Sequence, residues 1–153
     1  MLGIDPGVFQ VADEFVPNPF ASQRRKDKSK KLAAEKPTIL VVDDEQMIAD
    51  TTVEILNKFG FRAVHAYDGR TGLELAAKLK PDYLLADVLM PLMNGVELAI
   101  AVTKILPATK ILLFSGQAGI SDILREGQEK GYVFDLLAKP VHPEKLIEHL
   151  KKK

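Results

Sequence analysis

The sequence predicts an α/β fold in which five parallel strands form one sheet, flanked by five helices. From residue 37 onward, short apolar runs alternate with amphipathic stretches whose apolar residues recur every three or four positions. Successive strand–helix units imply parallel strands joined by right-handed crossovers, and continuously apolar runs are typical of strands covered on both faces. The expected strands are 38–43, 62–67, 83–87, 109–115 and 133–138, and the expected helices are 46–59, 71–79, 96–106, 121–130 and 143–151.

Glycine and proline residues delimit these elements. Gly60 can close the first helix because glycine readily adopts the left-handed conformation at a helix C-terminus. Asp68 and Gly69 stop the second strand, Pro81 blocks continuation of the second helix, and the third helix ends before Pro107. The residues expected to line the inner faces of the helices are Ile48, Thr52, Ile55, Leu56 and Phe59; Leu73, Ala76 and Ala77; Ile120, Ile123, Leu124 and Gly127; and Leu146, Ile147 and Leu150.

The composition fits one folded domain preceded by an extension. The chain has 153 residues, of which 46% are hydrophobic and 27% charged, and it has no cysteine, which excludes disulfides and thiolate metal sites. Residues 22–36 hold seven basic and two acidic side chains, whereas residues 37–153 hold 14 basic and 16 acidic ones. We therefore expect residues 1–36 to form a flexible basic extension and residues 37–153 to form the domain.

Membrane and nucleic-acid functions are disfavoured by the same composition. No stretch approaches the ~18 consecutive apolar residues of a membrane span. The first residues lack the basic start and apolar core of a secretion signal, so a cytoplasmic location is expected. The basic run could contact nucleic acid or acidic lipid, but it has no interleaved aromatic residues for stacking on bases, and a solvated linker is the simpler interpretation. No direct nucleic-acid-binding domain is expected.

Residues that can handle phosphate follow four of the apolar runs. Asp43 and Asp44 follow the run 39–42, Asp87 follows the run 83–86, Ser115 follows the run 111–114, and Lys139 follows the run 134–138. Ligands of open parallel sheets bind at the carboxyl ends of the strands, so we expect these side chains to share one cleft. Carboxylates in one cleft repel one another unless a cation lies between them. The sequence therefore predicts a cation and a phosphate at this edge.

In combination, these motifs resemble the receiver domain of two-component response regulators. The resemblance rests on Val41–Glu45, Asp87–Gly95, Ser115–Gly116 and Lys139–Pro140, and it covers residues 37–153. It implies a flavodoxin-like, doubly wound (βα)5 fold with strand order 2-1-3-4-5. Each motif alone has an ordinary structural interpretation as a helix cap, a turn or a solvated loop, and the ordered combination carries the prediction.

The resemblance implies that Asp87 is the phosphoacceptor, since a carboxylate can attack a phosphoryl group to form an acyl phosphate. Two anions must meet in that step, so a divalent ion is expected, namely Mg²⁺ or Mn²⁺. By resemblance, its direct ligands would be Asp44, Asp87 and the backbone carbonyl of Leu89. Asp43 would act through water.

Three further residues complete the implied site. Lys139 would place a positive charge against the phosphoryl oxygens, and Ser115 would offer them a hydroxyl donor. Gly116, which has no side chain, would leave the entering group unobstructed. In the family the peptide bond equivalent to Lys139–Pro140 is usually cis.

Two positions depart from the family pattern. The residue three before the lysine is usually an aromatic rotameric switch, but here it is Leu136, which puts the usual coupling in question. Leu89 is apolar, whereas polar residues are common two positions after the acceptor. An apolar side chain there could keep the attacking water out, so we expect phosphate to be lost slowly.

The implied function is a phosphorylation-controlled switch and not a classical turnover enzyme, although the protein would promote its own phosphorylation and dephosphorylation. A sensor histidine kinase or histidine phosphotransfer protein would donate the phosphoryl group. A downstream protein would bind the surface formed by 121–130, 133–138 and 143–151, and a homodimer is left open. No output domain follows Lys153, so the chain resembles a single-domain regulator or a segment of a longer protein.

Three other functions fit the sequence less well than a phosphorylation-controlled switch. A receiver-like interaction module that works without phosphorylation is favoured by Leu136 and disfavoured by the intact Asp44, Asp87 and Lys139. A phosphatase with an aspartyl nucleophile would need a second acid two residues after Asp87, where Leu89 stands. A nucleotide-binding fold is weaker still, because no glycine-rich loop follows the first strand.

Overall fold

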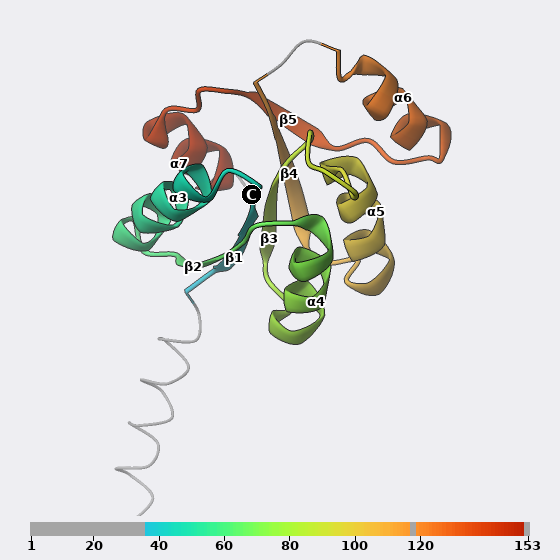
Figure 1. Cartoon of the computed structure of the whole chain (residues 1–153). Coiled ribbons are helices and arrows are strands. Elements are labelled where there is room, and N and C mark those ends of the chain that lie inside the picture. Colours follow the sequence, from blue (N-terminus) through green and yellow to red (C-terminus); the bar gives the residue numbers. More distant parts are fainter. Residues whose placement is uncertain (1–35, 117–118, 152–153) are drawn as a thin grey trace, which may run out of the picture. The chain divides into compact units, whose positions relative to one another are not determined.

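The computed structural model describes residues 36–116 and 119–151 (Figure 1). Apart from Lys36, the predicted extension and its basic run lie outside the described residues. The elements of the described part are, in chain order, β1 (Thr38–Val42), α3 (Gln46–Lys58), β2 (Arg62–Ala66), α4 (Gly69–Leu79), β3 (Tyr83–Asp87), α5 (Gly95–Ile105), β4 (Lys110–Ser115), α6 (Ser121–Glu129), β5 (Asp135–Ala138) and α7 (Pro143–Lys151).

The five strands form one parallel sheet in the order β2-β1-β3-β4-β5, as predicted. Most predicted boundaries are met within a residue or two. Helix α4 begins earlier than expected because the Asp68 side chain accepts a hydrogen bond from the Thr71 backbone N–H at 2.7 Å and so caps the helix at Gly69. Strand β5 begins later, at Asp135. Among the described residues, no helix combines the length and the apolar character needed to cross a bilayer.

Two apolar layers hold the helices against the sheet. Helices α3 and α7 cover one face of the sheet, and α4, α5 and α6 cover the other (Figure 1). Leu40 and Val42 of β1 belong to the apolar cluster under α4, α5 and α6, whereas Ile39 and Val41 belong to the cluster under α3 and α7. All four side chains are buried, as expected for a central strand with helices on both faces. This double cover leaves the carboxyl edge of the sheet as the place where polar side chains of several strands can meet.

Most of the helix residues expected to face inward do so, with two exceptions. Ala77 is exposed, because the buried stripe of α4 runs through Gly72 and Ala76, four residues apart. A Cβ at Gly72 would lie 2.8 Å from Val42 Cγ2, so the helix packs on its glycine side. Phe59 is about half exposed, since α3 ends at Lys58 and Phe59 is its C-cap.

Candidate functional site

The sheet register brings the predicted residues to one edge. Val42 and Ala86 are partners in neighbouring strands, so the next residues, Asp43 and Asp87, stand side by side. On the other side of β3, β4 ends at Ser115, whose partner in β5 is Ala138, the residue before Lys139. The polar residues at the ends of these strands are neighbours because the strands are parallel and paired in this register.

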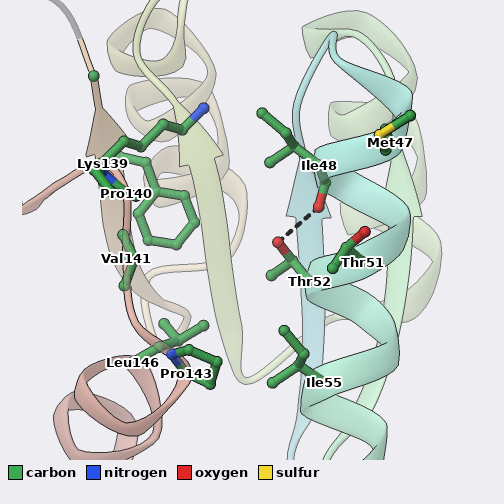
Figure 2. Close-up of a pocket in the computed structure, with 12 residues that line it drawn as sticks. Met47, Ile48, Thr51, Thr52, Ile55, Lys139, Pro140, Val141, Pro143 and Leu146 are labelled. Atoms are coloured by element: carbon green, nitrogen blue, oxygen red, sulfur yellow. Dashed lines mark hydrogen bonds between the residues drawn. The ribbon is translucent and has the colours of Figure 1, made fainter.

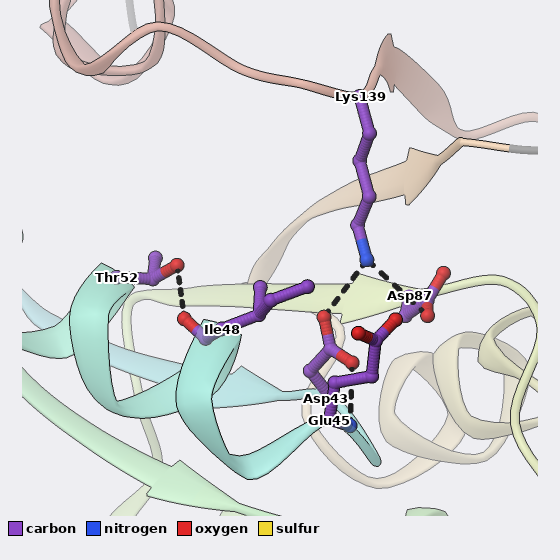
Figure 3. A network of polar contacts seen from close by, with 6 residues as sticks. All are labelled: Asp43, Glu45, Ile48, Thr52, Asp87 and Lys139. Atoms are coloured by element: carbon purple, nitrogen blue, oxygen red, sulfur yellow. Dashed lines mark hydrogen bonds and ion pairs between the residues drawn. The ribbon is translucent and has the colours of Figure 1, made fainter.

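A lysine bridges two of the carboxylates at this edge. Lys139 Nζ lies 2.9 Å from Asp43 Oδ2 and 3.3 Å from Asp87 Oδ2 (Figure 3). Asp43 and Asp87 are the buried charged residues of the described part of the chain. Asp44 is exposed, and one carboxylate oxygen from each of Asp43, Asp44 and Asp87 lies within 4.8 Å of the other two. The edge thus holds three carboxylates and one ammonium group, which contacts two of them.

Asp43 is fixed by its own chain as well as by the lysine. Its Oδ1 accepts a hydrogen bond from the backbone N–H of Glu45 at 3.0 Å, just before α3 begins, and its Oδ2 holds Lys139 (Figure 3). Both oxygens of this buried carboxylate thus have donors, as a buried charge requires. The direct hold on Lys139 was not foreseen from the sequence, which gave Asp43 only a water-mediated role.

Lys139 is positioned through its backbone and through a glycine. Its backbone N–H donates to the Ser115 carbonyl at 2.8 Å, and the Lys139–Pro140 peptide bond is cis, as the resemblance implied. A Cβ at Gly116 would lie 3.1 Å from Lys139 Cβ and 3.4 Å from its Cδ. Gly116 therefore leaves room for the aliphatic part of the lysine, a role that the sequence analysis missed.

The loop after Asp87 is held by residues to which the sequence analysis gave no individual role. Gly95, the first residue of α5, approaches the backbone so closely that a Cβ there would lie 2.3 Å from the Asp87 carbonyl oxygen. Its N–H donates to the Val88 carbonyl at 2.8 Å. Asn94 and Glu97 form a capping box, each side chain accepting from the other's backbone N–H. The glycine at this helix start thus fixes where Asp87 lies.

Burial and neighbouring charges shift two of the ionisable groups. Burial raises the pKa of Asp87, and the charge of Asp43 raises it further, against the lowering effects of Lys139 and of a backbone hydrogen bond with Leu89. Burial lowers the pKa of Lys139, but its hydrogen bond to Asp43 and the charges of both acids outweigh this, so its pKa lies above the usual value. We therefore expect the Asp87 carboxyl to be costly to ionise and Lys139 to stay charged.

Known proteins of similar sequence identify the family of this chain. The family model described as the response regulator receiver domain matches residues 39–151. The chain belongs to the response regulator receiver domain family. A curated relative, the chemotaxis protein CheY of Thermotoga maritima, is 32% identical over 118 residues, which cover 74% of this chain and 94% of the relative. The autoinducer 1 sensor kinase/phosphatase LuxN of Vibrio harveyi is 32% identical over 85 residues, covering 56% of this chain and 10% of that protein.

Solved structures give the same result for the fold. Chemotaxis protein CheY4 of Vibrio cholerae superposes with a TM-score of 0.68 at 28% identity, covering 76% of this chain and 98% of that one. A CheY-like receiver domain protein of Methanospirillum hungatei gives a TM-score of 0.70 at 28% identity, covering 77% and 93%. The chain therefore contains a receiver domain of the CheY type with a flavodoxin-like fold.

The donor set of this receiver domain fits a hard divalent cation. Asp43, Asp44 and Asp87 offer oxygen atoms only, which are the ligands that Mg²⁺ and similar ions prefer. Their summed charge exceeds that of Lys139, the cation that contacts two of them. The exposed position of Asp44 leaves one side of the cluster open to solvent, as an ion that keeps several waters would need.

The two positions that depart from the family pattern carry apolar side chains. Leu89 is partly buried, and its backbone hydrogen-bonds to Asp87, two residues earlier. Leu136 is 41% exposed on β5, where its partner is Leu113, and it lies two residues before the strand end at Ala138. Tyr132 and Phe134 stack on each other with ring centroids 6.0 Å apart, but both precede β5 on the side away from the site. Neither aromatic ring replaces the missing one at position 136.

Proposed function

We propose that Asp87 accepts a phosphoryl group from a phosphohistidine of a sensor histidine kinase or of a histidine phosphotransfer protein. An Asp87 carboxylate oxygen forms a bond to phosphorus, the phosphorus–nitrogen bond breaks, and its electron pair leaves with the imidazole. The observation that carries this proposal is the convergence of Asp43, Asp87 and Lys139 at one sheet edge, with Lys139 Nζ 3.3 Å from Asp87. No second acid stands two residues on, so the acyl phosphate would persist rather than turn over rapidly.

Asp44, Asp87 and the Leu89 backbone carbonyl would hold the Mg²⁺ or Mn²⁺ ion, with Asp43 acting through water. When bound, the ion would neutralise the approaching phosphoryl charge. The buried Asp43 would hold Lys139 aimed at the oxygens of the incoming group. Because Asp43 and its hydrogen-bond donors are already in place, little reorganisation is needed at the moment of reaction.

Ser115 and Gly116 would serve the phosphorylated form. Ser115 ends β4 at the same edge as Lys139 and would donate its hydroxyl to a phosphoryl oxygen. Gly116 would give the entering group access while accommodating the lysine chain. Charge and hydrogen bonds at this edge would then bias the surface of α6, β5 and α7, through which a downstream protein would bind.

An alternative is an interaction module of the same fold that works without phosphorylation, which Leu136 favours. Leucine has neither the ring nor the hydroxyl of the usual aromatic switch. Titration with Mg²⁺ and beryllofluoride, followed by NMR, distinguishes the two. Shifts at Asp87 and Lys139 support the phosphorylated switch, and their absence supports the module.

The remaining assignments follow from the proposed chemistry. Residues 37–153 would be the receiver domain and residues 1–36 a basic extension. The protein would act in the cytoplasm, where such kinases expose their phosphohistidine, and would be a signalling switch that promotes its own phosphorylation and dephosphorylation. A homodimer is compatible with this role. No nucleic-acid-binding domain is proposed.

Mass spectrometry after incubation with acetyl phosphate and Mg²⁺ tests the acceptor. The wild-type chain should gain one phosphoryl group, and the Asp87→Asn variant should gain none. Asp82→Asn, at the opposite end of β3, is the matched control and should be modified like the wild type. If the Asp87→Asn variant is still modified, the acceptor is assigned wrongly.

The apolar Leu89 leads to a prediction about the lifetime of the phosphorylated form. Leu89→Asn should shorten the half-life of the aspartyl phosphate several-fold, since an amide can orient the water that a leucine side chain excludes. The half-life is measured by the loss of the phosphoryl mass after removal of the donor. Leu92→Asn, a fully exposed position in the same loop, should leave it unchanged. An equal half-life for Leu89→Asn and the wild type contradicts the proposed exclusion of water.

A further inference from the structure

Helix α6 is attached to the rest of the domain by little buried surface. The structure describes all of its residues, and Gly127 alone among them is buried, whereas each of the other four described helices buries at least two residues. Ile123 and Leu124 are only partly buried against the apolar cluster that contains Val96. The helix packs mainly against α5 (Figure 1). With so few buried contacts, α6 is expected to open locally at a low cost in free energy.

The two ends of α6 are held to different degrees. At its start, the N-cap residue Ile120 makes no side-chain hydrogen bond to the helix. At its end, the Tyr132 backbone N–H donates to the Gly127 carbonyl at 2.9 Å. The Gly131 backbone N–H donates to the Gln128 carbonyl, also at 2.9 Å, and the two bonds together form a Schellman motif. Gly127 therefore belongs both to the packed face of α6 and to the turn that leads toward β5.

A contact without free space joins α6 to α5. A Cβ at Gly127 would lie 2.9 Å from Val96 Cγ1, closer than side-chain carbons approach one another in proteins. Val96 is buried, and its β-branched side chain has little rotational freedom in a helix. The two helices therefore meet at a glycine. Because packed interiors are nearly incompressible, a shift of Val96 changes where α6 can pack.

The same part of α5 contacts the backbone of Asp87. Val96 directly follows Gly95, and a Cβ at Gly95 would lie 2.3 Å from the Asp87 carbonyl oxygen. The Gly95 backbone N–H also donates to the Val88 carbonyl at 2.8 Å. Two consecutive residues of α5 thus lie between the backbone of Asp87 and the packed face of α6. Since neither contact has space for a methyl group, a shift of the Asp87 backbone displaces Val96 relative to Gly127.

We propose that the contact between Val96 and Gly127 couples α6 to the phosphorylation site, which makes Gly127 a positioning residue for Asp87. With α6 packed on α5, the start of α5 is held where Asp87 and the Leu89 carbonyl bind the metal ion. When α6 opens, this support is lost and the site binds its ligands more weakly. By thermodynamic reciprocity, ligands at Asp87 favour the packed position of α6 to the same extent. The proposal rests on the proposed function, since it concerns the regulation of the same site.

Binding of beryllofluoride to the full chain in the presence of Mg²⁺, measured by NMR titration, tests the coupling. Gly127→Ala should weaken this binding by about fivefold or more, because the new Cβ displaces α6 from Val96. Gly60→Ala is the matched control, since it places an alanine at a φ of +92° with open space around it and so lowers stability without touching α6. This control should bind like the wild type. Unchanged affinity in Gly127→Ala overturns the proposal.

A double-mutant cycle separates the contact from a general effect of alanine in α6. Val96→Ala removes Cγ1, the atom that the new Cβ at position 127 would meet. Adding Gly127→Ala to Val96→Ala should therefore change the affinity by less than about twofold, the non-additive result expected of residues in contact. If Gly127→Ala weakens binding equally with and without Val96, the contact does not carry the coupling.

Hydrogen exchange gives the reciprocal measurement. Beryllofluoride with Mg²⁺ should slow the exchange of the α6 amides in the wild type by about fivefold or more. Leu136→Ala should leave this response intact, because the coupling runs through α5 and not through Leu136 on β5. A response that is absent in the wild type, or lost in Leu136→Ala, contradicts the proposal. This measurement decides the matter if Gly127→Ala does not fold.

Failure of the proposed function gives a different pattern of results. If acetyl phosphate does not modify the wild type and beryllofluoride does not bind it, the proposed function is wrong and the coupling falls with it. If the wild type is modified and binds beryllofluoride, but Gly127→Ala binds it equally well, the coupling alone is wrong.

Discussion

Lys139 balances the charge of this site at the scale of single residues. It reaches Asp43 at 2.9 Å and Asp87 at 3.3 Å, and its side chain is only 18% exposed. Without it, two buried carboxylates would face each other with no counter-charge in contact. Like charges in a weakly solvated setting repel strongly, so the lysine stabilises the fold, and under the proposed function it would also face the incoming phosphoryl group.

The Lys139→Met variant tests this balance, since methionine keeps most of the aliphatic volume and removes the charge. Its free energy of unfolding without metal should fall by about 2–4 kcal/mol, because one partner of a buried ion pair has been removed. Added Mg²⁺ should then raise its Tm more than that of the wild type, since the ion supplies the missing positive charge. Both effects are measured by thermal unfolding with EDTA and with Mg²⁺.

Lys145→Met is the matched control, because Lys145 is exposed on α7. It should change neither the stability nor the response to Mg²⁺ by more than about 0.5 kcal/mol. An equally small effect of Lys139→Met would show that Lys139 does not balance the two acids.

At the scale of elements, the start of α5 sets the position of Asp87, the proposed acceptor. Gly95 packs against the Asp87 carbonyl, and the Asn94–Glu97 capping box holds this helix start in place. The loop after Asp87 therefore joins β3 to α5 with no space for a side chain at Gly95. A shift of this helix start would move Asp87 relative to the lysine.

Gly95→Ala should therefore destabilise the protein by about 3 kcal/mol or more, because the new Cβ would lie 2.3 Å from a backbone oxygen that cannot rotate away. It should also weaken Mg²⁺ binding, measured by calorimetry on the folded protein. Gly60→Ala is the control: its φ of +92° makes alanine strained, but a Cβ there has open space around it. That variant should lose about 1–2 kcal/mol of stability and keep its Mg²⁺ affinity. Unchanged Mg²⁺ affinity in Gly95→Ala would argue against the positioning role.

The sequence predicted these elements well because their signals are local. The apolar runs mark the strands, and residues such as Pro81 and Gly60 mark the ends of helices. The acids that follow the strands can also be found in the sequence. The packing partners of the glycines were not predictable, because Gly95 contacts Asp87 and Gly116 contacts Lys139 only after the fold forms. The direct bond between Asp43 and Lys139 joins residues 96 positions apart, and the sequence pattern showed only that both reach one edge.

An apolar groove of about 560 Å³ between α3 and the segment that joins β5 to α7 was beyond prediction for a related reason (Figure 2). The three- and four-residue spacing of Ile48, Thr52 and Ile55 predicts a buried helix face, and Leu146 is buried as expected. Periodicity shows which face of a helix points inward, but not the distance between that face and the element packed opposite it. Lys139, Pro140 and Val141 also line the groove, and they lie between β5 and α7, where the sequence has no periodicity.

At the scale of the whole molecule, protons and the proposed metal ion would compete for Asp87, whose ionisation affects global stability. The native state binds a proton at Asp87 more tightly than the unfolded chain does, because its pKa is raised above the ordinary value of 3.8. Without metal, the stability contributed by this group is present below that ordinary value and is lost as pH rises through the raised native pKa. A metal ion needs the ionised carboxylate, so with metal bound the native state holds fewer protons than the unfolded chain, and the slope reverses.

The difference in unfolding free energy between the wild type and Asp87→Asn isolates this group from the other acids. In EDTA, the wild type should lose stability relative to the variant as pH rises from about 4 to 7, by at most about 1.4 kcal/mol per pH unit. In saturating Mg²⁺, it should gain stability relative to the variant over the same interval, since ligand binding to the native state adds to its stability. Chemical denaturation at each pH measures both series. Two parallel series would mean that metal and proton do not share Asp87, and the ion would then have to bind elsewhere in the acidic cluster.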